Sequence, residues 1–212
     1  MILYGAPVSP FVRKVLVLAA EKSLELELVP VGIGDPNPDF LACSPFRKMP
    51  GFRDGDFTIS DSTAIVTYLE AKHPEPALIP TDAENRARVI WWDEFSDTIL
   101  VAKAGPIFFN RVVSPKFMGK PGDEAAALQG ESELPALFDY LESVIRASGH
   151  LVGDQLTLAD ISVASPFVNL AHTGITPDAA TYPKLTAFLA MMHARPGFAT
   201  WIPRERKMLG LV

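Results

Sequence analysis

The sequence is poor in the residues that form disulfides or hold metal ions. It has one cysteine, Cys43, and four histidines in 212 residues. A single cysteine excludes a disulfide within the chain and favours a cytoplasmic location. We expect Cys43 to be a small buried hydrophobic residue. The histidines (His73, His150, His172 and His193) are widely spaced and show no metal-ligand pattern, so we expect no metal.

The chain also lacks the long apolar stretch of about 20 residues that a membrane span requires. Its first residues show no charged region before an apolar block, hence no evident export signal. Lysine and arginine number 19 against 25 acidic residues, which gives a formal net charge of −6. Because the basic residues are also scattered, we expect neither a membrane nor a nucleic acid as partner.

The chain is rich in apolar residues, which follow alternating strand and helix patterns in its first part and helical patterns in its second. Hydrophobic residues make up 48% of it, enough for one large or two small cores. Prolines cluster where apolar residues are few, which indicates a linker over 76–82 (Pro74, Pro76 and Pro80). Strand and helix patterns alternate before this linker, and helical patterns dominate after it. We therefore predict one domain over 1–75 and an all-helical domain over 83–212.

The first domain begins with a short apolar strand over residues 1–4 and a turn. Ser9-Pro10 then predicts the start of a helix, because serine is a favoured N-cap and proline fits the first turn. The apolar residues that follow have helical spacing. We expect the charged residues of this helix to face water (Arg13, Lys14, Glu21 and Lys22).

A second strand is expected over 24–31, followed by a loose segment over 32–48. The order strand, helix, strand indicates a right-handed crossover between two parallel strands. With the hairpin that follows, it predicts a mixed sheet in a thioredoxin-like layout.

Three signals stand close together near residue 50. Pro50 heads a strand, Asp54-Gly55 is typical of a two-residue hairpin, and Asp61-Ser62 opens a helix that runs to Lys72. A cis Met49-Pro50 bond would turn the preceding main chain outward, where it can pair with an extended ligand as an added strand does.

The start of the helix near Ser62 adds a second binding element. Its free N–H groups and the helix dipole favour a carboxylate, and the Ser62 hydroxyl supplies a further donor. Asp61 can bind an ammonium group. A ligand with a peptide middle and an amino acid head satisfies all of these groups. The alternative is that Pro50 is an ordinary trans edge-strand proline and Asp61 only an N-cap.

Three motifs carry a resemblance to a known family. They are Ser-Pro-Phe-Val-Arg-Lys-Val at 9–15, Ser-Pro-Phe-Arg-Lys-Met-Pro at 44–50 and Asp-Ser-Thr-Ala-Ile at 61–65. In this order and spacing they resemble the glutathione-binding domain of a glutathione S-transferase, of a serine-type bacterial or plant-like cytosolic class.

The resemblance implies that Pro50 is cis and that the Met49 main chain pairs with the cysteinyl part of glutathione. It implies that Asp61 and Ser62 hold the γ-glutamyl end, and that Lys48 reaches the glycyl carboxylate.

Ser9 matches the family hydroxyl that assists the thiol. A free thiol with a pKa of about 8.5 is only a few per cent thiolate at neutral pH, and a hydroxyl at the positive end of a helix favours the thiolate. The alternative is that Ser9 only caps its helix. Tyr4 is a rival at the end of the first strand, which we expect to be a packing residue. Cys43 does not sit at the catalytic position.

The second domain shows further helical patterns over 83–103, 124–148, 158–170 and 183–194, and a C-terminal segment that starts at 195–197. Gly105-Pro106 is expected to break the first of these runs.

Thr157 and Asp160 have the spacing of a capping box, and Leu156 and Ile161 that of a hydrophobic staple. We interpret Asp160 as a structural carboxylate. The resemblance extends to this capping box and thus to the whole chain.

The function that the resemblance implies is conjugation of glutathione to a hydrophobic electrophile. We expect the acceptor between the two domains, against Phe11, Phe108 and Phe109, with Phe117 and Trp201 as further candidates, although any one aromatic residue is more often part of the core. Glutathione-dependent isomerisation, dehalogenation or peroxide reduction remain open, as does a non-catalytic binding protein.

A homodimer is expected, chiefly from the resemblance. The adjacent Trp91 and Trp92 support it to a lesser degree, because neighbours on one helix must face different directions.

Overall fold

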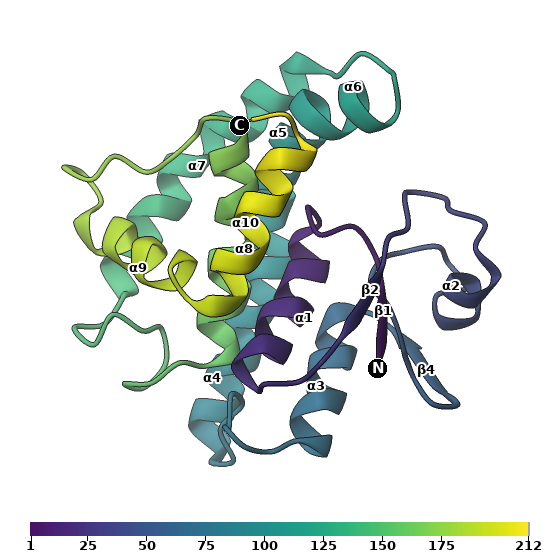
Figure 1. The fold of residues 1–212 in the computed structure, drawn as a ribbon. Coiled ribbons are helices and arrows are strands. Elements are labelled where there is room, and N and C mark those ends of the chain that lie inside the picture. The colour runs from purple at the N-terminus through teal and green to yellow at the C-terminus, as the bar shows by residue number, and fades with distance from the viewer. Residues whose placement is uncertain (212) are drawn as a thin grey trace.

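A mixed four-stranded sheet forms the first lobe of the computed structural model, which describes residues 1–211 (Figure 1). The strand order is β2-β1-β3-β4. Strand β1 (Ile2–Tyr4) pairs in parallel with β2 (Glu27–Val29) and antiparallel with β3 (Gly51–Asp54), which pairs antiparallel with β4 (Phe57–Ser60). The predicted thioredoxin-like layout is confirmed.

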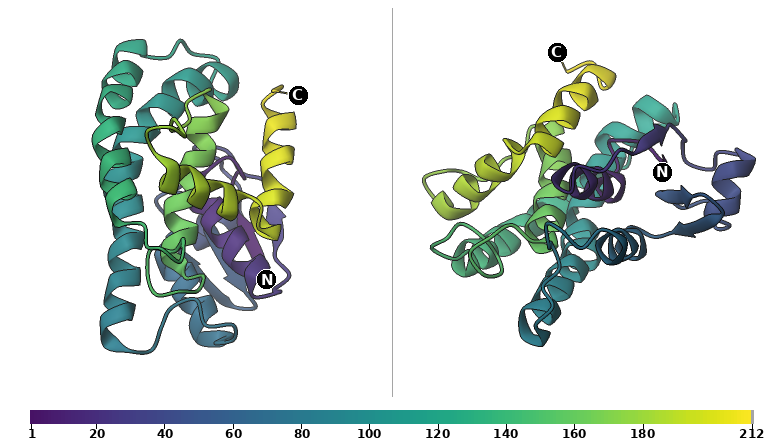
Figure 2. Two further views of the ribbon diagram at one scale, coloured as in Figure 1. Left: turned by 90° about the vertical axis from the view of Figure 1, so that its left-hand side faces the viewer. Right: turned by 60° about the horizontal axis from the view of Figure 1, so that its bottom comes forward.

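Helix α1 (Pro10–Glu21) lies between the sheet and the second lobe, as Figure 1 and the right-hand view of Figure 2 show. The prediction that its charged residues face water is therefore wrong. Arg13 and Lys14 are at most 1% exposed, Lys22 is buried, and Glu21 is largely covered. Both faces of α1 are packed, so its charges are satisfied by ion pairs instead of water. Their partners are Glu205, Asp93, Asp97, Glu70 and Arg195.

The hairpin loop lies one residue later than predicted. Asp54 is still paired with Phe57 in the ladder, so the two loop residues are Gly55 and Asp56. Gly55 has a φ of +60°, which suits the first loop position of a primed turn and which glycine adopts without steric cost.

The first lobe contains one helix that was not predicted from the sequence. Helix α3 (Ser62–Lys72) has the predicted bounds, whereas α2 (Pro38–Cys43) falls in the segment expected to be loose. Its signal was present: Asn37 accepts hydrogen bonds from the N–H groups of Asp39 and Phe40, and a proline follows it at the first helical position.

The second lobe is helical. A long run comprises α4 (Ala83–Glu94), η1 (Phe95–Leu100), α5 (Val101–Phe108), η2 (Phe109–Val113) and α6 (Ser114–Phe117), in which η1 and η2 are π-helical. It is followed by α7 (Glu124–Val144), α8 (Leu158–His172), α9 (Pro183–His193) and α10 (Pro196–Met208).

The predicted break at Gly105-Pro106 is wrong, because both residues lie within α5. Ala104 and Ile107 beside them are buried in the main core, so tertiary packing overrides the local signal of the proline. The wider π-helical turns of η1 and η2 flank this segment on both sides.

The predicted capping box of α8 is confirmed. The N–H of Thr157 donates to Asp160 Oδ2 at 2.9 Å, and the N–H of Leu151 donates to Oδ1 at 2.9 Å. Asp160 is fully buried and is a structural carboxylate. Leu156 packs against the core cluster that contains Ile161, as the staple requires.

One hydrophobic cluster runs through both lobes and joins Leu3 and Phe52 of the sheet to Phe138 and Phe167 of the helices. The domain bounds 1–75 and 83–212 stay a prediction. Among residues 1–211, no helix is both long and apolar enough to span a membrane.

Candidate functional site

The pairing register of the sheet brings the three sequence motifs to one edge. Gly51 of β3 lies opposite Tyr4 on one side and opposite Ser60 on the other. The chain therefore leaves β1 toward Ser9, enters β3 from Pro50 and leaves β4 toward Asp61 at the same end of the sheet. Segments that are up to 52 residues apart in the sequence, from Ser9 to Asp61, become neighbours there through strand pairing alone.

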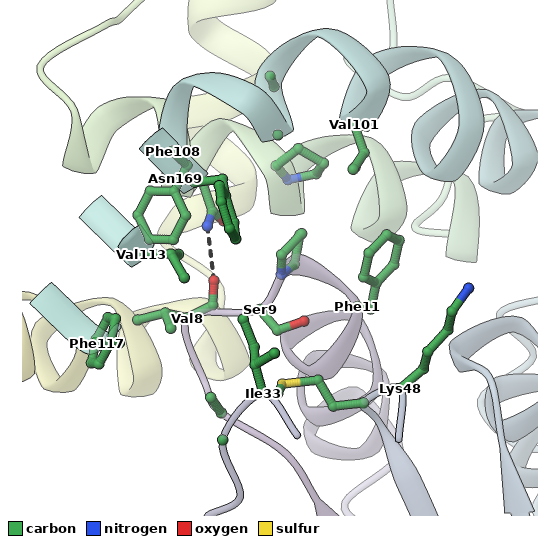
Figure 3. Close-up of a pocket in the computed structure, with 18 of the residues that line it drawn as sticks. Val8, Ser9, Phe11, Ile33, Lys48, Val101, Phe108, Val113, Phe117 and Asn169 are labelled. Carbon is green, nitrogen blue, oxygen red and sulfur yellow. Dashed lines mark hydrogen bonds between the residues drawn. The ribbon is translucent and has the colours of Figure 1, made fainter. Parts of the chain in front are cut away.

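Ser9 occupies the N-cap position of α1, yet in the described chain its side chain makes no capping hydrogen bond. Figure 3 shows it between Val8 and Phe11 on the wall of a cavity. The turn before it requires Gly5, since a Cβ there would come within 2.4 Å of Val12 Cγ2. The free hydroxyl favours a role beyond helix capping.

The loop before β3 carries Lys48 and Met49, and the predicted cis bond between Met49 and Pro50 is confirmed. Ser44 holds this loop: its Oγ donates to the Lys48 carbonyl at 2.6 Å and accepts from the Lys48 N–H at 3.1 Å. Arg47 has a φ of +56°. Lys48 and Met49 both line the cavity.

Asp61 and Ser62 lie at the start of α3, outside the lining of this cavity. Asp61 caps the helix, because its Oδ1 accepts the N–H of Ala64 at 3.0 Å. Its φ of +80° is rare for a residue with a side chain, and such strain costs about 1–3 kcal/mol. Ser62 is 2% exposed and its Oγ lies 3.4 Å from Asp97 Oδ2.

A buried ion cluster supports the start of α3. Lys14 Nζ lies 2.7 Å from both Asp93 Oδ1 and Asp97 Oδ2, and 3.3 Å from the Thr63 hydroxyl. Burial raises the pKa of Asp97 to about 6, although the charge of Lys14 opposes the rise. The cluster connects α1 and the second lobe to the helix end at which Ser62 lies.

The cavity lies between the two lobes, with a volume of about 580 Å³. Four of the candidate aromatic residues line it: Phe11 of α1, and Phe108, Phe109 and Phe117 of the long helical run. Figure 3 shows Phe11, Phe108 and Phe117 on its walls. Trp201 is not among the lining residues. It packs against the main core, with the Arg204 guanidinium 4.9 Å from its ring centre.

Tyr4 and Cys43 belong to a separate small core. Tyr4 is 3% exposed and packs against Phe40, with ring centres 6.4 Å apart. Burial raises the pKa of the Tyr4 phenol and of the Cys43 thiol above their ordinary values. The predictions that Tyr4 is a packing residue and Cys43 a small buried one are confirmed.

Comparisons with known proteins agree with this geometry. Residues 3–77 match the family model of the glutathione S-transferase N-terminal domain, and residues 109–205 that of the C-terminal domain. A glutathione S-transferase from Hyoscyamus muticus is 31% identical over 204 residues, which cover 94% of this chain and 96% of that protein. The chain belongs to the glutathione S-transferase family.

Membership of the glutathione S-transferase family makes the chain an enzyme of the transferase class and implies glutathione as co-substrate. The solved glutathione transferase F7 from Populus trichocarpa has a TM-score of 0.82 at 29% identity, covering 96% of this chain and 97% of its own. Elongation factor 1-gamma from Schizosaccharomyces pombe is 34% identical over 161 residues, 75% of this chain but 38% of that protein.

The groups that hold the site residues in place were not predictable from the sequence. Ser44 belongs to the motif at 44–50, but no sequence pattern indicates that its hydroxyl binds both main-chain groups of Lys48. Asn169, which lines the cavity, bonds to Arg13 across 156 positions of the sequence. Local patterns contain no signal for such a contact.

Proposed function

We propose that this protein activates the thiol of glutathione and conjugates it to hydrophobic electrophiles. The observation that carries the proposal is the meeting of Ser9, the cis Met49-Pro50 bond and the start of α3 at one sheet edge. An apolar cavity lies beside that edge, between the lobes.

In this proposal glutathione lies along the sheet edge. The Met49 main chain pairs with its cysteinyl part as an added strand does, next to Pro50. Its γ-glutamyl carboxylate lies at the positive end of α3 with Ser62, and its ammonium group faces Asp61, whose Oδ2 is not used in the helix cap. Lys48 binds the glycyl carboxylate.

Ser9 acts on the sulfur. Its hydroxyl donates a hydrogen bond to the thiolate, and the start of α1 adds the positive end of a helix dipole. Both favour the thiolate over the thiol and lower the pKa of bound glutathione. The proton leaves to solvent, so Ser9 need not act as a base.

The acceptor lies against Phe11, Phe108 and Phe109. The thiolate attacks an electrophilic carbon there, a carbon–sulfur bond forms, and either a leaving group departs or a proton is taken up from water. The apolar walls bind the acceptor by burial and exclude water from the sulfur.

Isomerisation, dehalogenation and peroxide reduction use the same first lobe and stay open as alternatives. A non-catalytic binding protein is the alternative from another class, and family membership argues against it; the relative named elongation factor 1-gamma matches this chain over only 38% of its own length. Retention on immobilised glutathione, followed by a panel of electrophiles, separates these possibilities. We expect retention and glutathione-dependent conjugation of at least one apolar aromatic electrophile. Retention without turnover of any panel member would contradict the proposal.

We further propose that the protein is a cytoplasmic homodimer. Phe46 is 88% exposed on the loop before β3, and Trp91 is 47% exposed on α4, whereas its neighbour Trp92 is 6% exposed. Exposed aromatic residues of this size are typical of an interface, and a second copy of the chain is the partner we propose. Cell fractionation tests the location.

A further inference from the structure

Two side chains of α8 hold the main chain on both sides of Ser9. Asn169 Nδ2 donates to the carbonyl of Val8 at 2.8 Å (Figure 3), and Ser165 Oγ donates to the carbonyl of Pro10 at 2.8 Å. The two residues are four positions apart, so they lie one above the other on the same face of the helix. The second lobe thus binds the carbonyl of the residue before Ser9 and the carbonyl of the residue after it.

Arg13 fixes the direction of both anchors. Its Nη1 donates to Asn169 Oδ1 at 2.8 Å, to the Ser165 carbonyl at 2.7 Å and to the Ser165 hydroxyl at 3.4 Å. With its oxygen held by Arg13, the Asn169 amide turns its NH₂ group toward Val8. Arg13 is fully buried, so these bonds form without competition from water.

Glu205 of α10 balances the charge of Arg13. Arg13 Nε and Nη2 donate to its two oxygens at 2.8 and 2.7 Å, and His172 Nε2 lies 2.8 Å from Oε2. Burial alone would raise the pKa of Glu205. The charge of Arg13 and the hydrogen bonds from His172 and Arg13 outweigh burial and hold that pKa below its ordinary value.

We infer that Asn169 and Ser165 are positioning residues, which act through Ser9 by fixing the direction of its hydroxyl. The inference rests on the proposed role of Ser9 as the donor to the glutathione sulfur. In the described chain Ser9 makes no capping bond that would orient its side chain, so its geometry depends on the main chain around it. The carbonyl of Ser9 itself accepts the N–H of Arg13 at 2.9 Å, so three successive carbonyls are bound.

The arrangement joins the sulfur side of the site to the acceptor side. Asn169 is 4% exposed and lines the acceptor cavity, while its amide bonds to the loop of the first lobe. The reaction needs the sulfur and the acceptor at a fixed separation, and a displacement of 1 Å can cost about 100-fold in rate. Because Asn169 belongs to the lobe that binds the acceptor, its bond to Val8 keeps the Ser9 hydroxyl, and with it the sulfur, at a constant distance from the acceptor.

A double-mutant cycle tests whether the two residues act through Ser9. The variants are Asn169→Asp and Ser165→Ala, each alone and combined with Ser9→Ala. Asn169→Asp keeps an oxygen toward Arg13 but removes the donor to Val8. Ser165→Ala removes the donor to Pro10 and the long 3.4 Å bond from Arg13, but leaves the 2.7 Å bond from Arg13 to the main-chain carbonyl of residue 165 in place.

The matched control is Ser96→Ala. Ser96 is also buried, and its Oγ donates to an α8 carbonyl, that of Ser162, at 2.6 Å. It therefore loses the same kind of bond to the same helix, away from Ser9. Circular dichroism confirms folding of each variant, and Ser165→Ala carries the test alone if Asn169→Asp fails to fold.

Each single variant is expected to lower kcat about tenfold while the KM for glutathione stays within about twofold. In the Ser9→Ala background the same changes should have no further effect, because the donor that they position is gone. Equal losses in both backgrounds, or an equal loss in Ser96→Ala, would show a general structural effect and overturn the inference. A Ser9→Ala variant with unchanged turnover would overturn the proposed role of Ser9 first.

Discussion

Single polar groups are proposed to set the affinity of the site for glutathione. Lys48 lines the cavity and its loop is fixed by Ser44, while Ser62 lies at the free N–H groups of α3. Because each is proposed to meet a carboxylate of the ligand, each contributes a charge-assisted hydrogen bond. The exposed lysine Lys184 on α9 has no such place and serves as a control.

We predict that Lys48→Ala and Ser62→Ala each weaken glutathione binding by about 1 to 3 kcal/mol, the range of a hydrogen bond to a charged group. Isothermal titration calorimetry measures this directly. Lys184→Ala should bind as the unchanged protein does. Unchanged affinity in both site variants would refute the assignment of these residues.

Asp97 should make stability depend on pH. Its folded-state pKa is raised from 3.8 to about 6, so the folded protein binds more protons than the unfolded chain between these values. The contribution of Asp97 to stability therefore falls as the pH rises through this window. Asp97→Asn removes this pH-dependent loss of stability and leaves Lys14 paired with Asp93.

Relative to the unchanged protein, Asp97→Asn should gain stability between pH 4 and 7, by up to about 3 kcal/mol for a shift of about two pKa units. Urea unfolding at each pH measures the difference. Asp154→Asn, at a carboxylate with 80% of its side chain exposed, is the control. A difference that does not change with pH would contradict the raised pKa.

At the scale of helices and strands, local signals predicted most of the first lobe. Ser9-Pro10 and Asp61-Ser62 marked helix starts that the structure confirms, because capping depends on residues close in sequence. Packing was not predictable in this way. The partners of Arg13 and Lys14 lie up to 192 and 83 positions away in the sequence. Pro106 lies inside a helix, because the residues beside it are buried in the core.

The same reasoning predicts the cost of losing one helix cap. Asp160→Ala removes the acceptor of two buried N–H groups, those of Thr157 and Leu151, and should cost about 2 to 4 kcal/mol. Asp123→Ala removes an exposed cap at the start of α7 and should cost about 1 kcal/mol. Chemical denaturation measures both. Equal losses would show that burial does not decide the effect.

At the scale of the whole molecule, the exposed aromatic surface of the single chain favours association of two copies. We predict a mass near twice the 23.1 kDa of the monomer by light scattering at micromolar concentration. Phe46→Ser and Trp91→Glu should each shift the equilibrium toward the monomer, because they remove exposed aromatic surface. A monomer mass for the unchanged protein would contradict the homodimer, and an unchanged mass in both variants would place the interface elsewhere.

The arrangement of the site also belongs to this scale. Motifs at 9–15, 44–50 and 61–65 could be found in the sequence, and the sheet register explains why they meet. The support behind them could not be found, because Asn169 and Asp97 come from a lobe that only the fold brings near. Sequence patterns thus predicted the groups proposed to touch glutathione and missed the groups that hold them.

The proposed activity depends above all on Ser9, which is proposed to stabilise the thiolate of bound glutathione. The most direct test is the ultraviolet absorbance of that thiolate against pH, measured in the unchanged protein, Ser9→Ala and Tyr4→Phe. We predict that Ser9→Ala raises the pKa of the bound thiol, leaves glutathione affinity nearly intact and lowers turnover about tenfold to a thousandfold. Tyr4→Phe should titrate as the unchanged protein does. A titration that moves in Tyr4→Phe and stays in place in Ser9→Ala would show that Tyr4, and not Ser9, acts on the sulfur.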